Sequence, residues 1–408
     1  MKARRGILLL LPALALATTF AIADTDLAIR AARIYPVSSA PIDDGVILIE
    51  EGKIKKIGPA SKIRIPSGVE VLEAEVVTPG LVDVHTVVGL AGIYNSDKGQ
   101  VQDQDQLEKS DPVQPELRAI DAYDPVEPLV DWVRSLGVTT VHTGHGPGAV
   151  ISGQTMVAKT RGETVEEVTV IPAAAVAATL GSSVSRNFKT PGTSAKNVSA
   201  LREALLAAQI YAGKQDGDSA PDRDLGLETL VQVLNGELAL MITAQTATEI
   251  ATALRLQREF GFRLWLDGAA EAYRMIEPLR EAGVAIMLHP TMIRAWGDTR
   301  NVAFDTAQRL AEAGIPFAIQ TGFESYVPKA RVVLYEAQAA VHFGLSPEDA
   351  LRSITLEPAR ILGLEERIGS LEKGKDADLV LFDGDPFEYT SHVCMVLVEG
   401  QVVSNVCR

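Results

Sequence analysis

The stretch from Leu81 to Val88 is almost wholly apolar or β-branched, and two polar side chains, Asp83 and His85, break the run. A run of this kind is typical of a strand that is buried on both faces. Polar side chains at the exit of such a strand cost free energy unless they are paired or used. We therefore predict a central strand here, with candidate chemistry at its carboxyl end.

Shorter segments with alternating apolar and polar residues lie near both ends of the chain, and each has the pattern of a half-buried strand. The early ones are Leu27–Tyr35, Gly45–Glu50 and Lys53–Ile57, and the late ones are Asp378–Phe382, Val393–Val398 and Gln401–Val403. Strands at both termini, separated by a long α/β segment, predict one small β-sandwich built from both chain ends.

Between these ends, apolar strands alternate with amphipathic helices, as a parallel α/β fold requires. The predicted strands are Val138–His142, Ala239–Ala244, Arg263–Leu266, Ala285–Leu288 and Pro316–Thr321. The helix after the second of these opens with the capping pair Thr246 and Glu249 and ends at Gly261. Together with two motifs near the ends of this region, the alternation predicts a (β/α)8 TIM-like barrel, in which the site lies at the carboxyl ends of the strands.

Two motifs carry a family resemblance. The sequence P-G-L-V-D-V-H-T at 79–86 resembles the start of the barrel in the amidohydrolase superfamily, and L-E-K-G-K-D-A-D-L-V-L at 371–381 resembles that family's return into its small β-sandwich. The Gly-rich stretch 144–154 resembles the loop after the second strand in secreted imidazolonepropionase-like amidohydrolases. The resemblance implies a barrel over 79–363 and a sandwich formed by 24–78 and 364–408.

The resemblance also implies a metal centre, from which this sequence departs. The family's first strand normally ends in His-x-His, and both imidazoles bind a divalent metal, whereas this chain has His85-Thr86-Val87. At later strand ends Thr243 and Asp267 stand where histidines are expected, and Gly322 stands where the family's catalytic Asp follows Thr. The expected ligand set is therefore degenerate, and His85 is its clear survivor.

A rearranged centre is one interpretation of the polar residues at the predicted strand ends. Four of the six histidines fall at or just past such ends, which is the catalytic face of a barrel. We assign His85 and His289 as candidate metal ligands and Asp83 and Asp267 as candidate bases. His142, together with His145 and Gln154 of the Gly-rich loop, is a candidate substrate-binding residue. The alternative is that the histidines satisfy backbone carbonyls or line an empty mouth.

Two functions are consistent with these residues. The first is an exported hydrolase of carbon–nitrogen bonds, acting on a small cyclic amide, imidazolone or peptide-like compound with one divalent metal, by expectation zinc. The second is a catalytically inactive pseudoenzyme without a metal, which binds a small ligand or pairs with an active amidohydrolase paralogue. A homo-oligomer fits either function.

The first 23 residues have the pattern of a secretory signal. Lys2, Arg4 and Arg5 form a basic start, an apolar run follows to Phe20, and Ala21-Ile22-Ala23 offers a small-x-small cleavage site. We therefore expect export to the periplasm or the medium. The formal net charge of −15 disfavours nucleic acid and anionic membrane surfaces as partners.

Two cysteines, Cys394 and Cys407, flank a predicted hairpin turn near Gly400. A turn centred on Gly400-Gln401 would place them opposite each other, whereas a turn at Glu399-Gly400 would not. Export makes a disulfide possible. The sequence alone leaves the bridge open.

Overall fold

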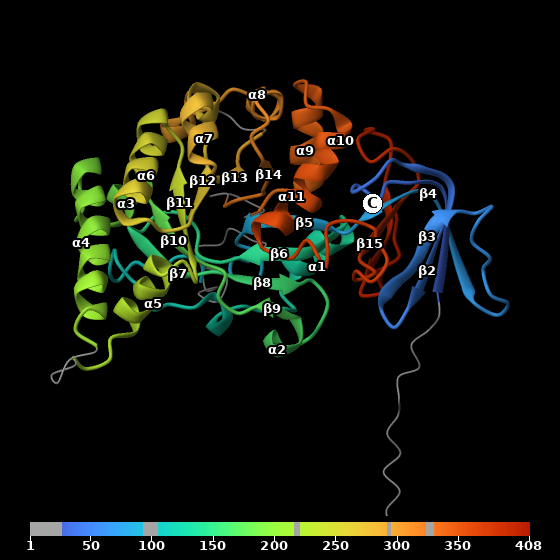
Figure 1. Cartoon of the computed structure of the whole chain (residues 1–408), viewed down its shortest axis with the longest axis horizontal. Helices are drawn as coiled ribbons and strands as arrows, with labels where there is room; N and C mark the ends of the chain where they lie inside the picture. The colour runs from blue at the N-terminus through green and yellow to red at the C-terminus, as the bar shows by residue number, and fades with distance from the viewer. Residues whose placement is uncertain (1–26, 93–104, 216–220, 292–294, 324–329) are drawn as a thin grey trace, which may run out of the picture.

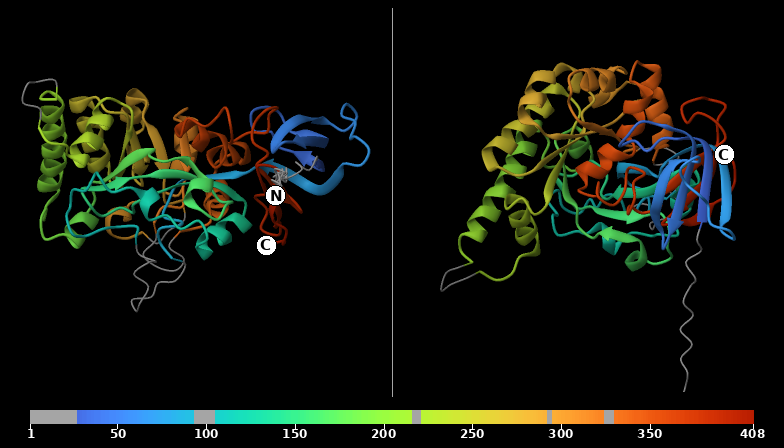
Figure 2. Two further views of the ribbon diagram at one scale, coloured as in Figure 1. Left: turned by 90° about the horizontal axis from the view of Figure 1, so that it is seen from below. Right: turned by 45° about the vertical axis from the view of Figure 1, so that its right-hand side comes forward.

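A computed structural model describes residues 27–92, 105–215, 221–291, 295–323 and 330–408. It consists of a small β body beside a larger α/β body (Figures 1 and 2). The predicted signal segment 1–23 lies outside the described residues, so its cleavage remains a prediction. Among the residues that are described, no helix is both long and apolar enough to cross a membrane.

Both chain ends contribute to one seven-stranded sheet with the order β17-β16-β15-β4-β1-β2-β3. Its strands are β1 (Leu27–Ile34), β2 (Ile42–Glu50), β3 (Lys53–Pro59), β4 (Glu70–Pro79), β15 (Leu379–Phe382), β16 (Val393–Val398) and β17 (Gln401–Ser404). The two halves meet where β4 runs antiparallel to β15. The composite origin agrees with the prediction, but the described strands form a single sheet, so two facing sheets of a sandwich remain a prediction.

The chain passes from this sheet into the α/β body through Gly80. A Cβ atom at this position would lie 2.2 Å from Thr139 Oγ1, which no side chain tolerates. The glycine therefore lets β5 (Leu81–Thr86) begin directly beside β6 (Val138–Thr143). All six residues of β5 are buried, as the apolar run predicts.

The α/β body contains parallel strands in two sheets. One has the order β14-β13-β12-β11-β10-β7 and the other β5-β6-β8-β9. A parallel bridge between Thr86 and Gly322 connects the end of β5 to the segment after β14. The remaining bounds are β7 (Ile151–Gln154), β8 (Met156–Lys159), β9 (Thr169–Ile171), β10 (Ala175–Thr179), β11 (Ala239–Ala244), β12 (Leu264–Gly268), β13 (Ala285–Leu288) and β14 (Phe317–Ile319).

A mixed α/β fold is thus confirmed, while eight regular β/α units are not found in the described part of the chain. After β6 the chain does not form a helix. It returns as β7, antiparallel to β10, and β8, antiparallel to β6. The reason is local: Gly144, Gly146, Pro147 and Gly148 follow β6, and glycine and proline are the poorest helix formers. A closed parallel barrel remains a prediction.

Helices flank the parallel strands, and α4 is the outermost on the side away from the β body (Figure 1). Helix α6 has the predicted capping box between Thr246 and Glu249 and ends at Gly261, whose φ of 76° is left-handed. The helices are α1 (Pro128–Ser135), α2 (Val165–Val168), α3 (Ser183–Asn187), α4 (Ser194–Ala212), α5 (Leu225–Leu234), α6 (Ala247–Phe260), α7 (Ile276–Ala282), α8 (Thr306–Glu312), α9 (Val333–His342), α10 (Pro347–Ser353) and α11 (Leu356–Ile361).

A buried ion cluster joins the two bodies and explains the late K-G-K-D-A-D motif. Lys159 of β8 is almost fully buried and lies 3.1 Å from Asp376, and it also contacts the Asp378 carboxylate. Asp376 in turn pairs with Lys53 and Arg367. Because each buried charge has a partner, the motif can anchor the β body to the strands of the α/β body.

Cys394 and Cys407 form a disulfide. The hairpin turn is centred on Glu399 and Gly400, both with positive φ, and Val398 pairs with Gln401. In a regular ladder this turn would not align the cysteines. A register shift between Val396 and Leu397 adds one residue to the second strand. That shift alone would pair Cys394 with Val406. Val393 pairs with Arg408, so a second added residue in the later strand brings Cys394 and Cys407 opposite each other.

Candidate functional site

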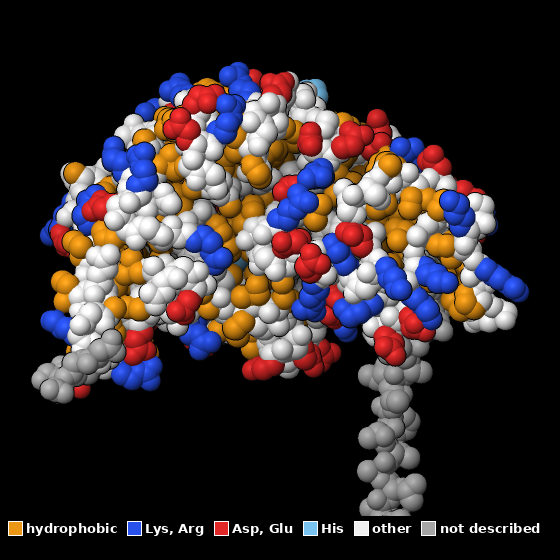
Figure 3. Space-filling model, viewed as in Figure 1, with side chains coloured by type: hydrophobic (Ala, Val, Ile, Leu, Met, Phe, Trp, Pro, Cys, Tyr) orange, Lys and Arg blue, Asp and Glu red, His pale blue; other side chains and the backbone are white. Residues whose placement is uncertain are grey.

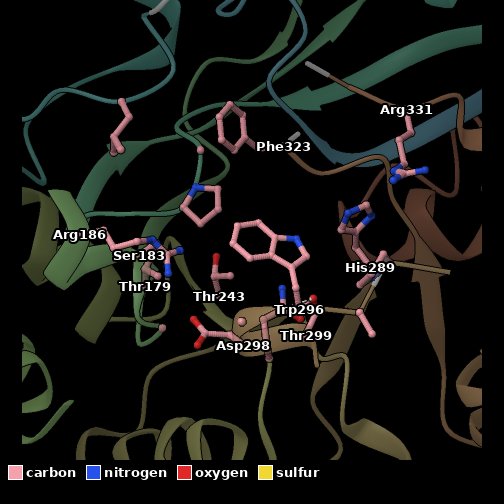
Figure 4. A pocket seen from close by; sticks show the side chains of 18 of the residues that line it. Thr179, Ser183, Arg186, Thr243, His289, Trp296, Asp298, Thr299, Phe323 and Arg331 are labelled. Atoms are coloured by element: carbon pink, nitrogen blue, oxygen red, sulfur yellow. Dashed lines mark hydrogen bonds between the residues drawn. The ribbon is translucent and has the colours of Figure 1, made fainter. Parts of the chain in front are cut away.

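A large cavity of about 1590 Å³ opens at the carboxyl ends of the parallel strands. Thr179 of β10, Thr243 of β11 and His289, just after β13, contribute to its wall (Figure 4). Gly146 and Pro147 of the Gly-rich loop line it too. This is the position at which parallel α/β proteins place their ligands.

His85 and Asp267 form a buried pair that contacts Thr243 of the cavity wall. His85 Nδ1 lies 2.7 Å from Asp267 Oδ1, and the two residues are 1% and 3% exposed. Asp267 Oδ1 also accepts a hydrogen bond of 2.7 Å from Gln320 Nε2, and its Oδ2 accepts one of 2.6 Å from Thr243 Oγ1. Both carboxylate oxygens are therefore engaged within the protein.

The pKa of His85 is raised and the pKa of Asp267 is lowered, as expected for an ion pair. Burial by itself would lower the pKa of His85, but the charge and hydrogen bond of Asp267 outweigh it, so the pKa is raised. Burial would raise the pKa of Asp267, but the charge of His85 and the hydrogen bonds from His85, Thr243 and Gln320 lower it to about 2. His85 Nε2 is buried and has no hydrogen-bond partner in the described structure.

Asp83, the other predicted base, fastens β5 to the segment after β14. Its Oδ1 accepts a hydrogen bond of 3.1 Å from the Thr321 backbone N–H, and its Oδ2 contacts the Thr321 hydroxyl. Burial raises the pKa of Asp83 to about 6, although both hydrogen bonds from Thr321 oppose this shift. The placement supplies a structural use for this carboxyl, and its role as a base remains a prediction.

His142 is fully engaged inside the protein. Its Nδ1 lies 2.6 Å from the Val84 carbonyl, which only accepts, so Nδ1 carries the proton. Its Nε2 lies 2.7 Å from Thr155 Oγ1 and accepts from that hydroxyl. Burial lowers the pKa of His142 to about 3.

The other two predicted substrate-binding residues lie in or beside the Gly-rich loop. His145 is buried against Gly153, and neither ring nitrogen has a hydrogen-bond partner in the described structure. Burial lowers its pKa to about 4. Gln154 Nε2 donates to Thr229 Oγ1 at 3.0 Å. Neither residue, nor His142, is among the described residues that line the cavity, and their predicted role stays untested.

His289 lines the cavity and packs against Gly322. Its Nδ1 lies 3.3 Å from the Gln320 carbonyl. Its ring covers Gly322, where a Cβ atom would lie 3.1 Å from the His289 ring. Gly322 also has a left-handed φ of 62°. The position at which the resemblance places the catalytic Asp therefore has no side chain, and an imidazole packs across it.

The donors that are present do not fit a metal centre of the family's usual kind. A catalytic zinc site normally has three protein ligands. His85 has one unpartnered nitrogen, but Val87 is apolar and both oxygens of Asp267 are already engaged. Among the described residues, no group of three or more His, Cys, Asp or Glu side chains is placed to hold a metal ion. The predicted ligands His85 and His289 thus lack a third described donor of these types.

Several residues that line the cavity or support the pair were not singled out from the sequence. Gln320 holds Asp267, while Arg186 and Trp296 line the cavity. Trp296 follows the predicted strand Ala285–Leu288 by a few residues, and an aromatic residue soon after the carboxyl end of a parallel strand is a usable signal of a binding surface. Arg186 lies in a short helix whose position only the fold determines.

Comparisons with known proteins agree with this architecture. The model of the amidohydrolase family matches residues 230–404. The chain is 25% identical over 405 residues to the amidohydrolase tasK of Hapsidospora irregularis, which covers 87% of this chain but only 39% of tasK. It is 24% identical over 369 residues to an imidazolonepropionase of Rhizorhabdus wittichii, covering 84% of this chain and 88% of that protein.

A solved structure supports the same assignment. The crystal structure of an amidohydrolase from Thermotoga maritima MSB8 superposes with a TM-score of 0.85 at 29% identity, covering 93% of this chain and 100% of that one. The match extends over both the β body and the strands that carry the candidate site. From the two sequence motifs, the fold and these relatives together, we conclude that the chain belongs to the amidohydrolase superfamily.

Proposed function

We propose that this protein is a ligand-binding member of the amidohydrolase superfamily in which an internal hydrogen-bond network replaces the metal centre. The observation that carries the proposal is the engagement of Asp267, whose two oxygens bind His85, Thr243 and Gln320. A carboxylate held by three donors within the protein has little capacity left for a cation.

The cavity above the network supports a binding role. Its volume of about 1590 Å³ exceeds the roughly 300–1,000 Å³ of most small-molecule sites. Several relatives are named imidazolonepropionase, after a small-molecule substrate, which is consistent with a small-molecule ligand here.

Metal content tests the proposal. Protein purified without chelator is analysed by elemental mass spectrometry beside His85→Ala and a control, His392→Ala, whose ring is exposed and bound to Asp383. We expect far less than one metal ion per chain in all three proteins. Near-stoichiometric zinc, iron or manganese that is lost only in His85→Ala would overturn the proposal.

A second candidate is hydrolysis of a carbon–nitrogen bond at a reduced centre. The observation that favours it is His85 Nε2, an unpartnered nitrogen on a buried, ion-paired imidazole. Such a group can donate a proton to a leaving nitrogen. Turnover of cyclic amides or dipeptides that His85→Ala abolishes, while His392→Ala retains it, would establish this function instead.

We also propose that the protein is exported. The signal-like segment 1–23 motivates this proposal, and the disulfide between Cys394 and Cys407 supports it because such bonds persist in oxidising compartments. Cell fractionation followed by N-terminal mass spectrometry tests it. The expected product begins at Asp24 outside the cytoplasm, whereas an intact Met1 in the cytosolic fraction would contradict export.

A further inference from the structure

The described wall of the cavity is positively charged in a chain that is acidic overall. Lys109, Arg186 and Arg331 line it, against a single carboxylate, Asp298. The chain as a whole has a formal net charge of −15. On the face shown in Figure 3, acidic and basic side chains are interspersed. The concentration of cations at the cavity is therefore local.

The cations differ in how they are held. Arg331 pairs with the buried carboxylate of Glu336 at 3.4 Å, and Asp298 accepts a hydrogen bond of 2.7 Å from the Ser182 backbone N–H. Arg186 donates to Ser182 Oγ at 2.6 Å and has no carboxylate partner among the described side chains. The ammonium group of Lys109 likewise has no carboxylate partner within the described part of the chain.

Arg186 and Lys109 approach the cavity from segments that meet. Asn187 of α3 and Leu107 both pack against Gly148. A Cβ atom at Gly148 would lie 2.4 Å from Asn187 Nδ2 and 2.9 Å from Leu107 Cδ2. The loop that carries Lys109 and the helix that carries Arg186 are thus neighbours. In Figure 4, Arg186 and Ser183 lie together on one side of the cavity and His289 with Arg331 on the other.

Between these sides the cavity presents aromatic surface. Trp296 is 64% exposed, and its indole lies across the middle of the view in Figure 4. Phe343 is 38% exposed and stacks on Phe304 with ring centroids 4.8 Å apart. All three residues line the cavity. Exposed aromatic rings in a concave site gain free energy when a flat apolar group covers them.

We propose that the cavity binds an amphipathic organic anion. Arg186 and Lys109 receive a carboxylate or a comparable anionic group, and the aromatic residues Trp296, Phe304 and Phe343 receive a flat apolar body. This inference rests on the proposed ligand-binding function and adds the chemical class of the ligand. A guanidinium suits a carboxylate because it offers parallel N–H donors in a planar fork.

A pair of fluorescent probes tests the proposal on the full-length mature chain. Dansylglycine carries a flat aromatic body and a carboxylate, and dansylamide carries the same body without the charge. We expect dansylglycine to bind about tenfold more tightly than dansylamide, as one charge-assisted contact permits. Its affinity should also fall with added salt because the cations are exposed.

Three variants assign the two halves of the site. Arg186→Gln should weaken dansylglycine about tenfold and leave dansylamide within about twofold. Trp296→Ala should weaken both probes. Arg64→Gln, a surface control of equal charge change on the β body, should weaken neither.

The outcomes distinguish failure of the ligand-binding function from failure of the anion subsite. If neither probe binds, the ligand-binding function itself fails. If both probes bind equally and Arg186→Gln changes neither affinity, the cavity binds ligands but the anion subsite is wrong. If Arg64→Gln weakens dansylglycine as much as Arg186→Gln does, the preference reflects overall charge and the subsite is likewise rejected.

Discussion

Asp267 is the acceptor at the centre of the candidate site. It accepts hydrogen bonds from a histidine, a threonine and a glutamine that come from three other strands or strand ends, namely His85, Thr243 and Gln320. Its negative charge raises the pKa of the buried imidazole of His85. The pair therefore behaves as one unit, in which a change to either member alters the other.

Replacing that carboxylate tests the ion pair. In Asp267→Asn the amide keeps the shape but removes the charge, so burial of His85 is no longer outweighed. We expect the pKa of His85 to fall below its ordinary value of 6.5. Titration of histidine-labelled protein by NMR measures this shift. Asp83→Asn, which leaves Asp267 in place, should produce a smaller decrease, and equal decreases in both variants would contradict the assignment.

The neutral histidines predict how acid affects stability. His142 and His145 have pKa values near 3 and 4 because they are buried, so in the folded protein they stay neutral where the unfolded chain is protonated. Below pH 6.5 the unfolded state then binds more protons, and acid weakens the fold through these two groups. Asp83 acts in the opposite direction between its ordinary value of 3.8 and about 6, since there its folded state binds the extra proton.

One variant isolates the contribution of His145. In His145→Asn the slope of unfolding free energy against pH between about 4 and 6.5 should decrease by up to about 1.4 kcal/mol per pH unit. Urea denaturation at a series of pH values measures the slope. His392→Asn, at an exposed ring, is the control. An unchanged slope in His145→Asn would show that its ring titrates normally.

At the scale of elements, β8 and the loop before β15 depend on one lysine. Lys159 is 4% exposed at its side chain and pairs with two carboxylates, whereas Lys53 is 54% exposed and pairs with one of the same two, Asp376. Both cations contact the motif that joins the β body to the α/β body. Lys159 is therefore a buried structural charge, whereas Lys53 is a surface charge.

This contrast gives a matched pair of substitutions. Lys159→Met should lower the free energy of unfolding by about 3–5 kcal/mol, since it removes the lysine with which the buried Asp378 carboxylate pairs. Lys53→Met should cost no more than about 1 kcal/mol because its charge is solvated. Chemical denaturation of both variants measures the difference. Equal losses would mean that the cluster does not hold the two bodies together.

The segment after β14 depends on a glycine. Gly322 has a left-handed φ, and its missing Cβ leaves room for the His289 ring. Gly363 also has a left-handed φ, of 70°, but no atom lies within 4 Å of the Cβ position there. Backbone strain alone costs about 1–2 kcal/mol at either position.

Gly322→Ala should therefore destabilise the protein by roughly 1 kcal/mol more than Gly363→Ala, since the added methyl group must also displace the imidazole. Thermal and chemical denaturation compare the two variants. If both cost the same, His289 yields freely, and the ring does not block a side chain at position 322.

Cys407 and Arg408 are bonded to β16 of the seven-stranded sheet, to which both chain ends contribute. Cys394 of β16 is bonded to Cys407, and Val393 exchanges two backbone hydrogen bonds with Arg408. The bridge closes a loop with a sequence separation of 13 residues. Cross-linking a loop of about this length restricts the unfolded chain by roughly 3 kcal/mol.

Replacing both cysteines with serine should therefore lower the free energy of unfolding by about 3 kcal/mol. Reduction of the natural protein should produce a similar loss, and the double-serine variant should not respond to reductant. Denaturation with and without reductant measures both effects. A natural protein that is insensitive to reductant would contradict this contribution of the bridge.

Sequence patterns predicted much of this framework because periodicity and turn chemistry act locally. The β5 strand, the capping of α6 and the origin of the small sheet in both chain ends follow from residues that are close in sequence. The antiparallel return after β6 was not predicted, although its glycines and proline were visible. The disulfide stayed open because register shifts that together add two residues to the second strand, which no local pattern indicates, decide the pairing.

The residue pattern indicated the family and the buried strand that carries His85, and the resemblance predicted that Val87, Thr243 and Gly322 stand where the family has its metal ligands and catalytic Asp. The contacts of these residues depend on the packed fold. The pairing of His85 with Asp267 joins residues 182 positions apart, and the cavity draws Arg186 and Trp296 from separate segments. Side-chain type is a property of one position, whereas distance, burial and pKa depend on all the elements packed around it.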